Sequence, residues 1–98
     1  MKITKNMDGT HLTVAVEGEL DTLNAHELEE ALMGSLDGVT ELTIDLADLN
    51  YTTSSGLRVL VKAHKAMYDR GVMRVVNVND IVQEIFSITG LDNVLRIE

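Results

Sequence analysis

Residues 41–68, ELTIDLADLNYTTSSGLRVLVKAHKAMY, carry the strongest folding signal in the sequence. Leu42, Ile44 and Leu46 alternate there with polar residues, which is the period-two pattern of a buried strand. From Leu57 the apolar residues recur at helical spacing, and this pattern predicts an amphipathic helix that lies against a sheet. The predicted apolar stripe consists of Leu57, Leu60, Val61, His64 and Tyr68, widened by Val59, Ala63 and Met67. The sequence therefore predicts a strand, a polar crossing and a helix in succession.

The predicted crossing is rich in hydroxyl groups, because residues 51–56 read YTTSSG. One Ser or Thr commonly caps a helix by accepting a hydrogen bond from a free amide of the first turn, which contributes about 1 kcal/mol. The hydroxyls of residues 52–55 exceed what one cap requires. The first turn of a helix also carries free amides and a partial positive charge, which favour an anion. An exposed serine here could carry a phosphate without repulsion from its own helix, and Gly56 would let another backbone approach closely.

Two segments carry a resemblance to a known family. Residues 45–60, DLADLNYTTSSGLRVL, resemble the signature of the STAS domain and of its free-standing bacterial members, the anti-sigma factor antagonists. Residues 18–21, GELD, are similar to the segment that precedes the first helix of that family. The resemblance covers essentially the whole chain and implies a single STAS domain over residues 1–98. It implies an α/β fold, with a mixed sheet of about four to five strands and helices mostly packed on one face.

The resemblance also implies a modified serine and a binding surface. In the family the central serine of the signature is phosphorylated, and by position that serine is Ser54. Many antagonists have Asp just before it, whereas this chain has Thr53, which leaves Thr53 open as an alternative acceptor. The adjacent Ser55 is a further alternative. The implied partner-binding residues are Asp21, Thr22, Tyr51, Thr53, Ser54, Ser55, Gly56 and Arg58. Arg58 could form an ion pair with a phosphate on Ser54. We favour the interpretation that it is a solvated residue or a contact to the partner.

The implied function is that of a protein-binding switch, not of an enzyme. Without phosphate, the surface around Ser54 would bind an anti-sigma factor that is also a serine kinase with bound ATP, and a sigma factor would be released to direct transcription. Phosphorylation would add about −1.5 to −2 charges, and an unpaired charge in a packed interface is costly. A serine phosphatase acting on the phosphorylated form would restore binding.

Two other interpretations of the same surface remain open. The chain could be a scaffold STAS subunit of a lipid transporter or stress-signalling complex, in which case its binding would not depend on a phosphate at Ser54. It could also be a small domain that holds an anionic ligand at the Ser54 helix start. Binding experiments with variants at Ser54, and titration with nucleotides or phospholipids, distinguish these alternatives.

Composition narrows the kinds of partner and compartment. The net charge of −8 argues against nucleic acid as a partner, because binding of a polyanion needs clustered basic residues. The chain has no Cys, which excludes disulfides and Cys-ligated metals. The sequence has no apolar run near bilayer-spanning length and no apolar segment at its N-terminus, so a cytoplasmic protein without membrane insertion is expected. We expect a monomer or a weak dimer.

Reactive side chains outside the signature are few. The histidines lack metal-ligand spacing, and neither a Gly-x-Ser-x-Gly motif nor a phosphate-binding Gly-x-x-x-x-Gly-Lys loop is present. We therefore predict no catalytic residue, no metal site and no cofactor.

The N-terminal residues predict a hairpin followed by a helix. Residues 2–6 and 11–17 read as strands joined by a turn, and Gly18 is predicted to end the second strand. Asn24 and Glu27 have the spacing of a capping box, so a helix from Ala25 to about Leu36 is expected.

The C-terminal residues predict a strand and a short helix. The long helix is expected to stop at Gly71, and residues 72–78, VMRVVNV, read as a mostly buried strand. Asn79 or Asp80 is expected to cap a short helix that ends at Gly90. The inward residues expected in these two elements are Val72, Val75, Val76 and Val78, then Ile81, Val82, Ile85 and Phe86. Residues 91–98 suggest a last strand or a docking turn.

Overall fold

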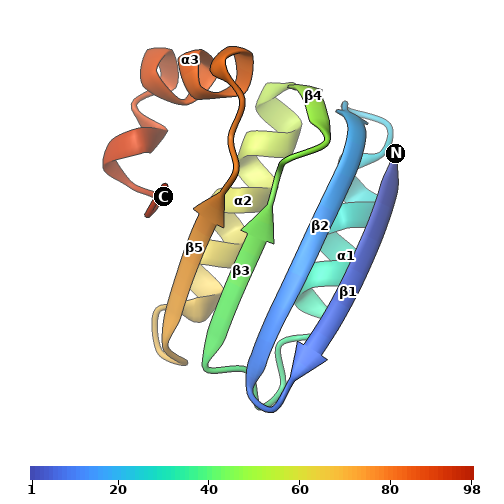
Figure 1. Cartoon of the computed structure of the whole chain (residues 1–98), viewed down its shortest axis with the longest axis vertical. Coiled ribbons are helices and arrows are strands. Elements are labelled where there is room, and N and C mark those ends of the chain that lie inside the picture. The colour runs from blue at the N-terminus through green and yellow to red at the C-terminus, as the bar shows by residue number, and fades with distance from the viewer.

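The computed structural model describes all 98 residues, Met1–Glu98. Figure 1 shows one layer of strands with helices packed behind it and at one end. The elements in chain order are β1 (Lys2–Asp8), β2 (His11–Leu20), α1 (Ala25–Met33), β3 (Glu41–Asp45), β4 (Leu49–Thr52), α2 (Ser54–Met67), β5 (Val72–Val76), α3 (Asp80–Thr89) and a 3-10 turn, η1 (Leu91–Asn93).

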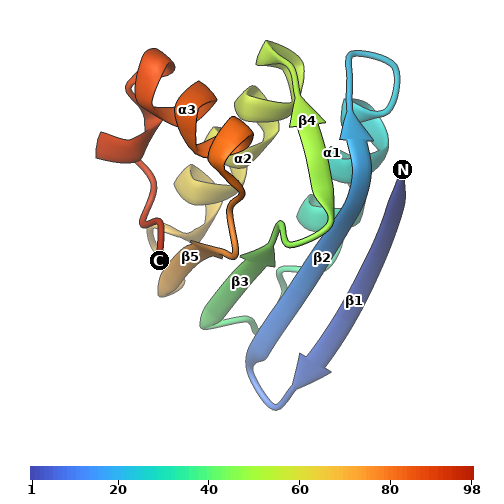
Figure 2. The same ribbon diagram turned by 45° about the horizontal axis from the view of Figure 1, so that its top comes forward.

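The strands form one mixed sheet. Its order is β1-β2-β3-β5, and β4 pairs with the C-terminal end of β2. β1 runs antiparallel to β2, whereas the β2–β3, β2–β4 and β3–β5 pairs are parallel. Helices α1 and α2 lie side by side on one face of the sheet, while α3 lies beside β4 (Figure 2). A five-stranded mixed sheet with helices mainly on one face confirms the predicted fold class.

The core lies between the sheet and the helices. Every second residue of the central strands points into it, so that Val14 and Val16 of β2 and Leu42 and Ile44 of β3 are buried. This is the alternation predicted for the strand that precedes the hydroxyl-rich residues. The core is aliphatic apart from Phe86, and the only buried polar side chain is that of Thr52.

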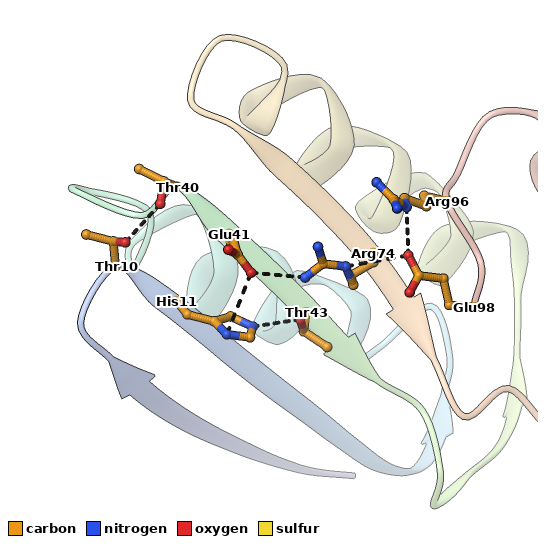
Figure 3. Close-up of polar contacts among 8 residues, drawn as sticks. All are labelled: Thr10, His11, Thr40, Glu41, Thr43, Arg74, Arg96 and Glu98. Carbon is orange, nitrogen blue, oxygen red and sulfur yellow. Dashed lines mark hydrogen bonds and ion pairs between the residues drawn. The ribbon is translucent and has the colours of Figure 1, made fainter.

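The opposite face of the sheet is not covered by helices and carries a polar network (Figure 3). Glu41 on β3 accepts a hydrogen bond from Arg74 on β5 at 3.1 Å and lies 3.8 Å from His11 on β2. The other ring nitrogen of His11 lies 2.8 Å from the Thr43 hydroxyl. Arg74 also lies 3.5 Å from the carboxylate of Glu98, whose amide donates to a β5 carbonyl. The network therefore links three strands and holds the C-terminal residues against β5.

β2 is longer than predicted and α1 is shorter. Gly18 does not end β2, because its φ of +98° permits a bulge, after which Glu19 and Leu20 pair with β4. α1 ends at Met33 and not near Leu36, since the chain tightens into a turn in which the Ser35 amide donates to the Leu32 carbonyl.

The crossing before α2 is largely a strand. Residues Leu49–Thr52 form β4, and the helix starts at Ser54, within the hydroxyl-rich residues that precede its apolar stripe. The buried stripe of α2 consists of Gly56, Leu57, Val59, Leu60, Ala63 and Met67. The prediction was wrong for Tyr68, which lies just past the end of α2 at Met67 and is 79% exposed.

The C-terminal third follows the predicted order with different inward residues. Met73 and Val75 are the buried positions of β5, because the strand alternates strictly, so Val72 and Val76 are only half-buried. Ile81 is exposed, which corrects its inward assignment. The Asn79 side chain caps α3 by accepting from the Val82 amide, as predicted. The final residues form η1, and Ile97 then bridges to β5.

Candidate functional site

The hydroxyl-rich residues lie where β4 passes into α2 at one end of the sheet. Figure 2 shows β4 running beside the end of β2 before the chain enters α2. Thr53 is the extended residue between the two elements, with φ −114° and ψ 174°, and Ser54 is the first residue of the helix. The Thr53 amide donates to the Leu20 carbonyl at 3.0 Å. The end of β2 therefore holds the start of α2 in place.

The two threonines of this segment use their hydroxyls locally. Thr52 is buried and donates to the Thr53 carbonyl, and the Thr53 hydroxyl donates to the Leu20 carbonyl, each at 3.3 Å. Contrary to the predicted cap, no side chain accepts a hydrogen bond from the first-turn amides of α2. These amides and the positive end of the helix dipole remain available beside Ser54.

The two serines differ in their surroundings. Ser55 is half-buried, and its hydroxyl lies 3.3 Å from the hydroxyl of Thr22 in the loop between β2 and α1. Ser54 is exposed, and its hydroxyl forms no hydrogen bond with another group of the protein. Ser54 is thus the hydroxyl in residues 52–55 that is free to react or to contact a partner.

The β2–α1 loop is held by Asp21. Its carboxylate accepts hydrogen bonds from the amides of Leu23 and Asn24, each at 2.9 Å. Asn24 in turn accepts from the Asp21 amide at 2.8 Å, so its side chain does not cap α1 and the predicted capping box with Glu27 is absent. These contacts fix the loop that places Thr22 against Ser55.

An open pocket of about 280 Å³ lies beside Ser54 between α2 and the end of α3. Its lining residues are Ser54, Leu57, Arg58, Val61, Thr89 and Leu91. The Arg58 side chain is exposed and forms neither an ion pair nor a hydrogen bond with the protein. The pocket thus combines an apolar floor with one free hydroxyl and one free cation.

The structure brings most of the predicted site residues to one end of the molecule. Thr22 and Ser55 are in contact, and Tyr51 on β4 is half-exposed just before them. Gly56, in contrast, is buried beneath the surface. The sequence analysis missed Leu23, which is 92% exposed next to Thr22. A leucine in an otherwise polar loop was the only signal for it.

Gly56 allows α2 to start close to β2. A Cβ at this position would lie 2.5 Å from the Thr52 hydroxyl oxygen and 2.6 Å from the Leu20 side chain. We expect Gly56→Ala to lower the free energy of unfolding by about 1–3 kcal/mol through overpacking, measured by urea denaturation. Ser55→Ala, at the adjacent position, should change it by less than about 0.5 kcal/mol. Equal stability of the two variants would contradict this packing role.

The structure contains no group of three or more His, Cys, Asp or Glu side chains arranged to hold a metal ion. None of its helices has the length and apolar character needed to cross a bilayer.

Comparisons with known proteins agree with this architecture. The sequence model of the STAS domain matches residues 2–98. An anti-sigma-B factor antagonist from Listeria monocytogenes is 34% identical over 97 residues, which cover 96% of this chain and 84% of that protein. The crystal structure of an anti-sigma factor antagonist from Mycobacterium paratuberculosis has a TM-score of 0.89 at 25% identity, covering 98% of this chain and 83% of that one. The structure of the Bacillus cell fate determinant SpoIIAA in its phosphorylated form has a TM-score of 0.77 at 16% identity. The match covers 99% of this chain and 91% of that one.

Proposed function

Since the chain belongs to the STAS domain family, we propose that it is an anti-sigma factor antagonist whose binding is controlled by phosphorylation of Ser54. Its relatives named anti-sigma-B factor antagonist are 33–34% identical over most of the chain, which supports the role of a binding regulator. The protein acts on an anti-sigma factor in the cytoplasm, where transcription is regulated.

One observation supports Ser54 as the phosphate acceptor. Among the hydroxyls of residues 52–55 it is the one that is both exposed and without a hydrogen-bond partner. The Thr53 hydroxyl is already bonded to a carbonyl of β2, and Ser55 faces Thr22. A kinase can reach the Ser54 oxygen without breaking a contact that positions α2.

The proposed cycle has two states. In the first, the unphosphorylated surface around Ser54 binds the anti-sigma factor, which releases its sigma factor. The anti-sigma factor is also a serine kinase, and it transfers the γ-phosphoryl group of ATP to the Ser54 oxygen, releasing ADP and a proton. The phosphate places about −1.5 to −2 charges in the contact surface, so the complex separates. A serine phosphatase then hydrolyses the phosphate with water and restores the first state.

The surface around Ser54 supplies apolar and polar contacts for the partner. Tyr51 on β4 and Leu23, which follows Thr22 in the β2–α1 loop, are exposed and offer apolar area. Tyrosine is one of the residue types that most often carry the binding energy of an interface, which favours Tyr51 as the main apolar contact. The net charge of −8 favours a basic surface on the anti-sigma factor and accelerates the encounter.

Phosphate transfer to purified variants tests the proposal. The protein would be incubated with an anti-sigma kinase from its own organism and labelled ATP, and the modified residue would be mapped by mass spectrometry. Native protein, Thr53→Val and Ser55→Ala should be labelled, whereas Ser54→Ala should not. Labelling of Ser54→Ala at Thr53 or Ser55 would move the switch to that residue, and the absence of label in all variants would favour the scaffold role.

A further inference from the structure

We infer that Arg58, interpreted from the sequence alone as a solvated residue or a partner contact, instead binds the phosphate group on Ser54, so that the phosphorylated protein holds its own phosphate in the pocket. This inference rests on the proposed phosphorylation of Ser54, and it gives the phosphate a second effect on binding. Besides adding negative charge, the phosphate would withdraw Arg58 from the surface offered to the anti-sigma factor.

Spacing along α2 places the two residues together. Arg58 follows Ser54 by four positions in one continuous helix, Ser54–Met67. Side chains at this spacing stand one above the other on the same helix face, with about 5–6 Å between their Cβ atoms. Both residues also line the same pocket. A phosphate on the Ser54 oxygen would therefore lie within reach of the guanidinium group without movement of the backbone.

Arg58 is free to take this role. It is the only arginine of the chain with no hydrogen bond or ion pair. The other three are engaged: Arg70 with the Leu36 carbonyl, Arg74 with Glu41 and Glu98, and Arg96 with Glu98. Arg58 therefore has no competing anion within the protein.

The pocket chemistry favours an arginine–phosphate pair. A guanidinium group can donate two parallel hydrogen bonds to phosphate oxygens, which makes the pair stronger than a single contact. Leu57, Val61 and Leu91 form the apolar floor of this open pocket, so the aliphatic part of the Arg58 side chain can pack on them while its charged end meets the phosphate. Thr89 already donates to carbonyls of its own helix. Arg58 supplies the only cationic group of the pocket lining, and no carboxylate there competes with a phosphate for it.

The test measures how strongly the phosphate holds its second proton. Phosphoserine would be incorporated at position 54 during synthesis, and the phosphorus NMR shift of the folded protein would be followed against pH. A nearby cation favours the dianion, so Arg58→Ala should raise the second pKa of the phosphate by roughly 0.5–1 unit, a threefold to tenfold gain in proton affinity. Arg58→Lys should recover part of the difference, because it keeps the charge but loses the paired geometry.

Lys65→Ala is the matched control. It removes the same charge from an exposed position of the same helix, 11 residues and therefore about 16 Å further along the axis than Ser54. Its phosphate should titrate like that of the native protein, and a shift in Arg58→Ala no larger than in Lys65→Ala would overturn the inference. Because the phosphate is installed without a kinase, failure of Arg58 as a phosphate ligand is distinguishable from failure of Ser54 as a kinase substrate.

Discussion

Ser54→Asp is expected to weaken binding to the anti-sigma factor roughly 100-fold, or by about 3 kcal/mol, while the fold is retained. The free, exposed Ser54 hydroxyl lies at the centre of the proposed contact surface. A carboxylate enclosed there by the partner would lose its water, and its pairing with Arg58 would withdraw that cation from the surface offered to the partner. The same carboxylate in free protein lies beside the uncapped first turn of α2, where a negative charge is stabilising by about 0.3–1 kcal/mol. Calorimetric titration would measure the affinity, and thermal unfolding would report the fold.

Two further variants separate charge from size. Ser54→Asn has nearly the shape of the Asp variant but no charge, so it should bind much more tightly than Ser54→Asp. Ser54→Ala should bind about as well as native protein, since the Ser54 hydroxyl forms no hydrogen bond that the fold needs. If the Asn and Asp variants were equally impaired, side-chain size and not charge would control docking. If Ser54→Asp bound like native protein, the phosphate switch would be wrong.

The sequence predicted the candidate site, and the family resemblance put Ser54 first among its hydroxyls, but the sequence could not show which hydroxyls are engaged in contacts. Residues 51–56 stand out locally, because a run of Ser and Thr before an amphipathic helix is visible in the sequence alone. The contacts that occupy Thr53 and Ser55 come from Leu20 and Thr22, more than 30 positions earlier in the chain. Which hydroxyl stays free therefore depends on how β2 and its following loop pack against α2. Thr89 and Leu91 of the pocket escaped prediction for the same reason.

The elements that were predicted best are those with strong local periodicity. Leu42 and Ile44 are buried as their alternation indicated. β4 was missed because it has only four residues, Leu49–Thr52, with buried residues at its two ends and no alternation between them. β4 forms because β2 continues beyond the bulge at Gly18, so that Glu19 and Leu20 can pair with β4. Helical spacing likewise continued to Tyr68, although α2 had already ended at Met67.

Gly71→Ala is expected to cause the largest loss of stability among the glycine variants, about 3 kcal/mol or more. The sequence suggested only that Gly71 ends a helix. In the structure a Cβ at this position would lie 2.0 Å from the carbonyl oxygen of Thr40, and the backbone φ is +157°. That carbonyl accepts a hydrogen bond from the Val72 amide at 3.0 Å, which starts the pairing of β3 with β5. Relief of the clash would therefore disturb the edge of the sheet, and urea denaturation would measure the cost.

Gly38→Ala provides the comparison that isolates the clash. Gly38 also has a positive φ, +75°, but no atom lies within 4 Å of a Cβ placed there. Its substitution should cost only the left-handed backbone conformation, about 1–2 kcal/mol. Gly56→Ala should fall between the two, because its Cβ would meet buried side-chain atoms of Thr52 and Leu20, which shift more readily than a backbone carbonyl of the sheet. Gly71→Ala could instead lower the free energy of unfolding no more than Gly38→Ala does. The loop at Gly71 would then be able to move away from Thr40 without disturbing the sheet, and the close approach of Gly71 to Thr40 would not be needed for the pairing of β5 with β3.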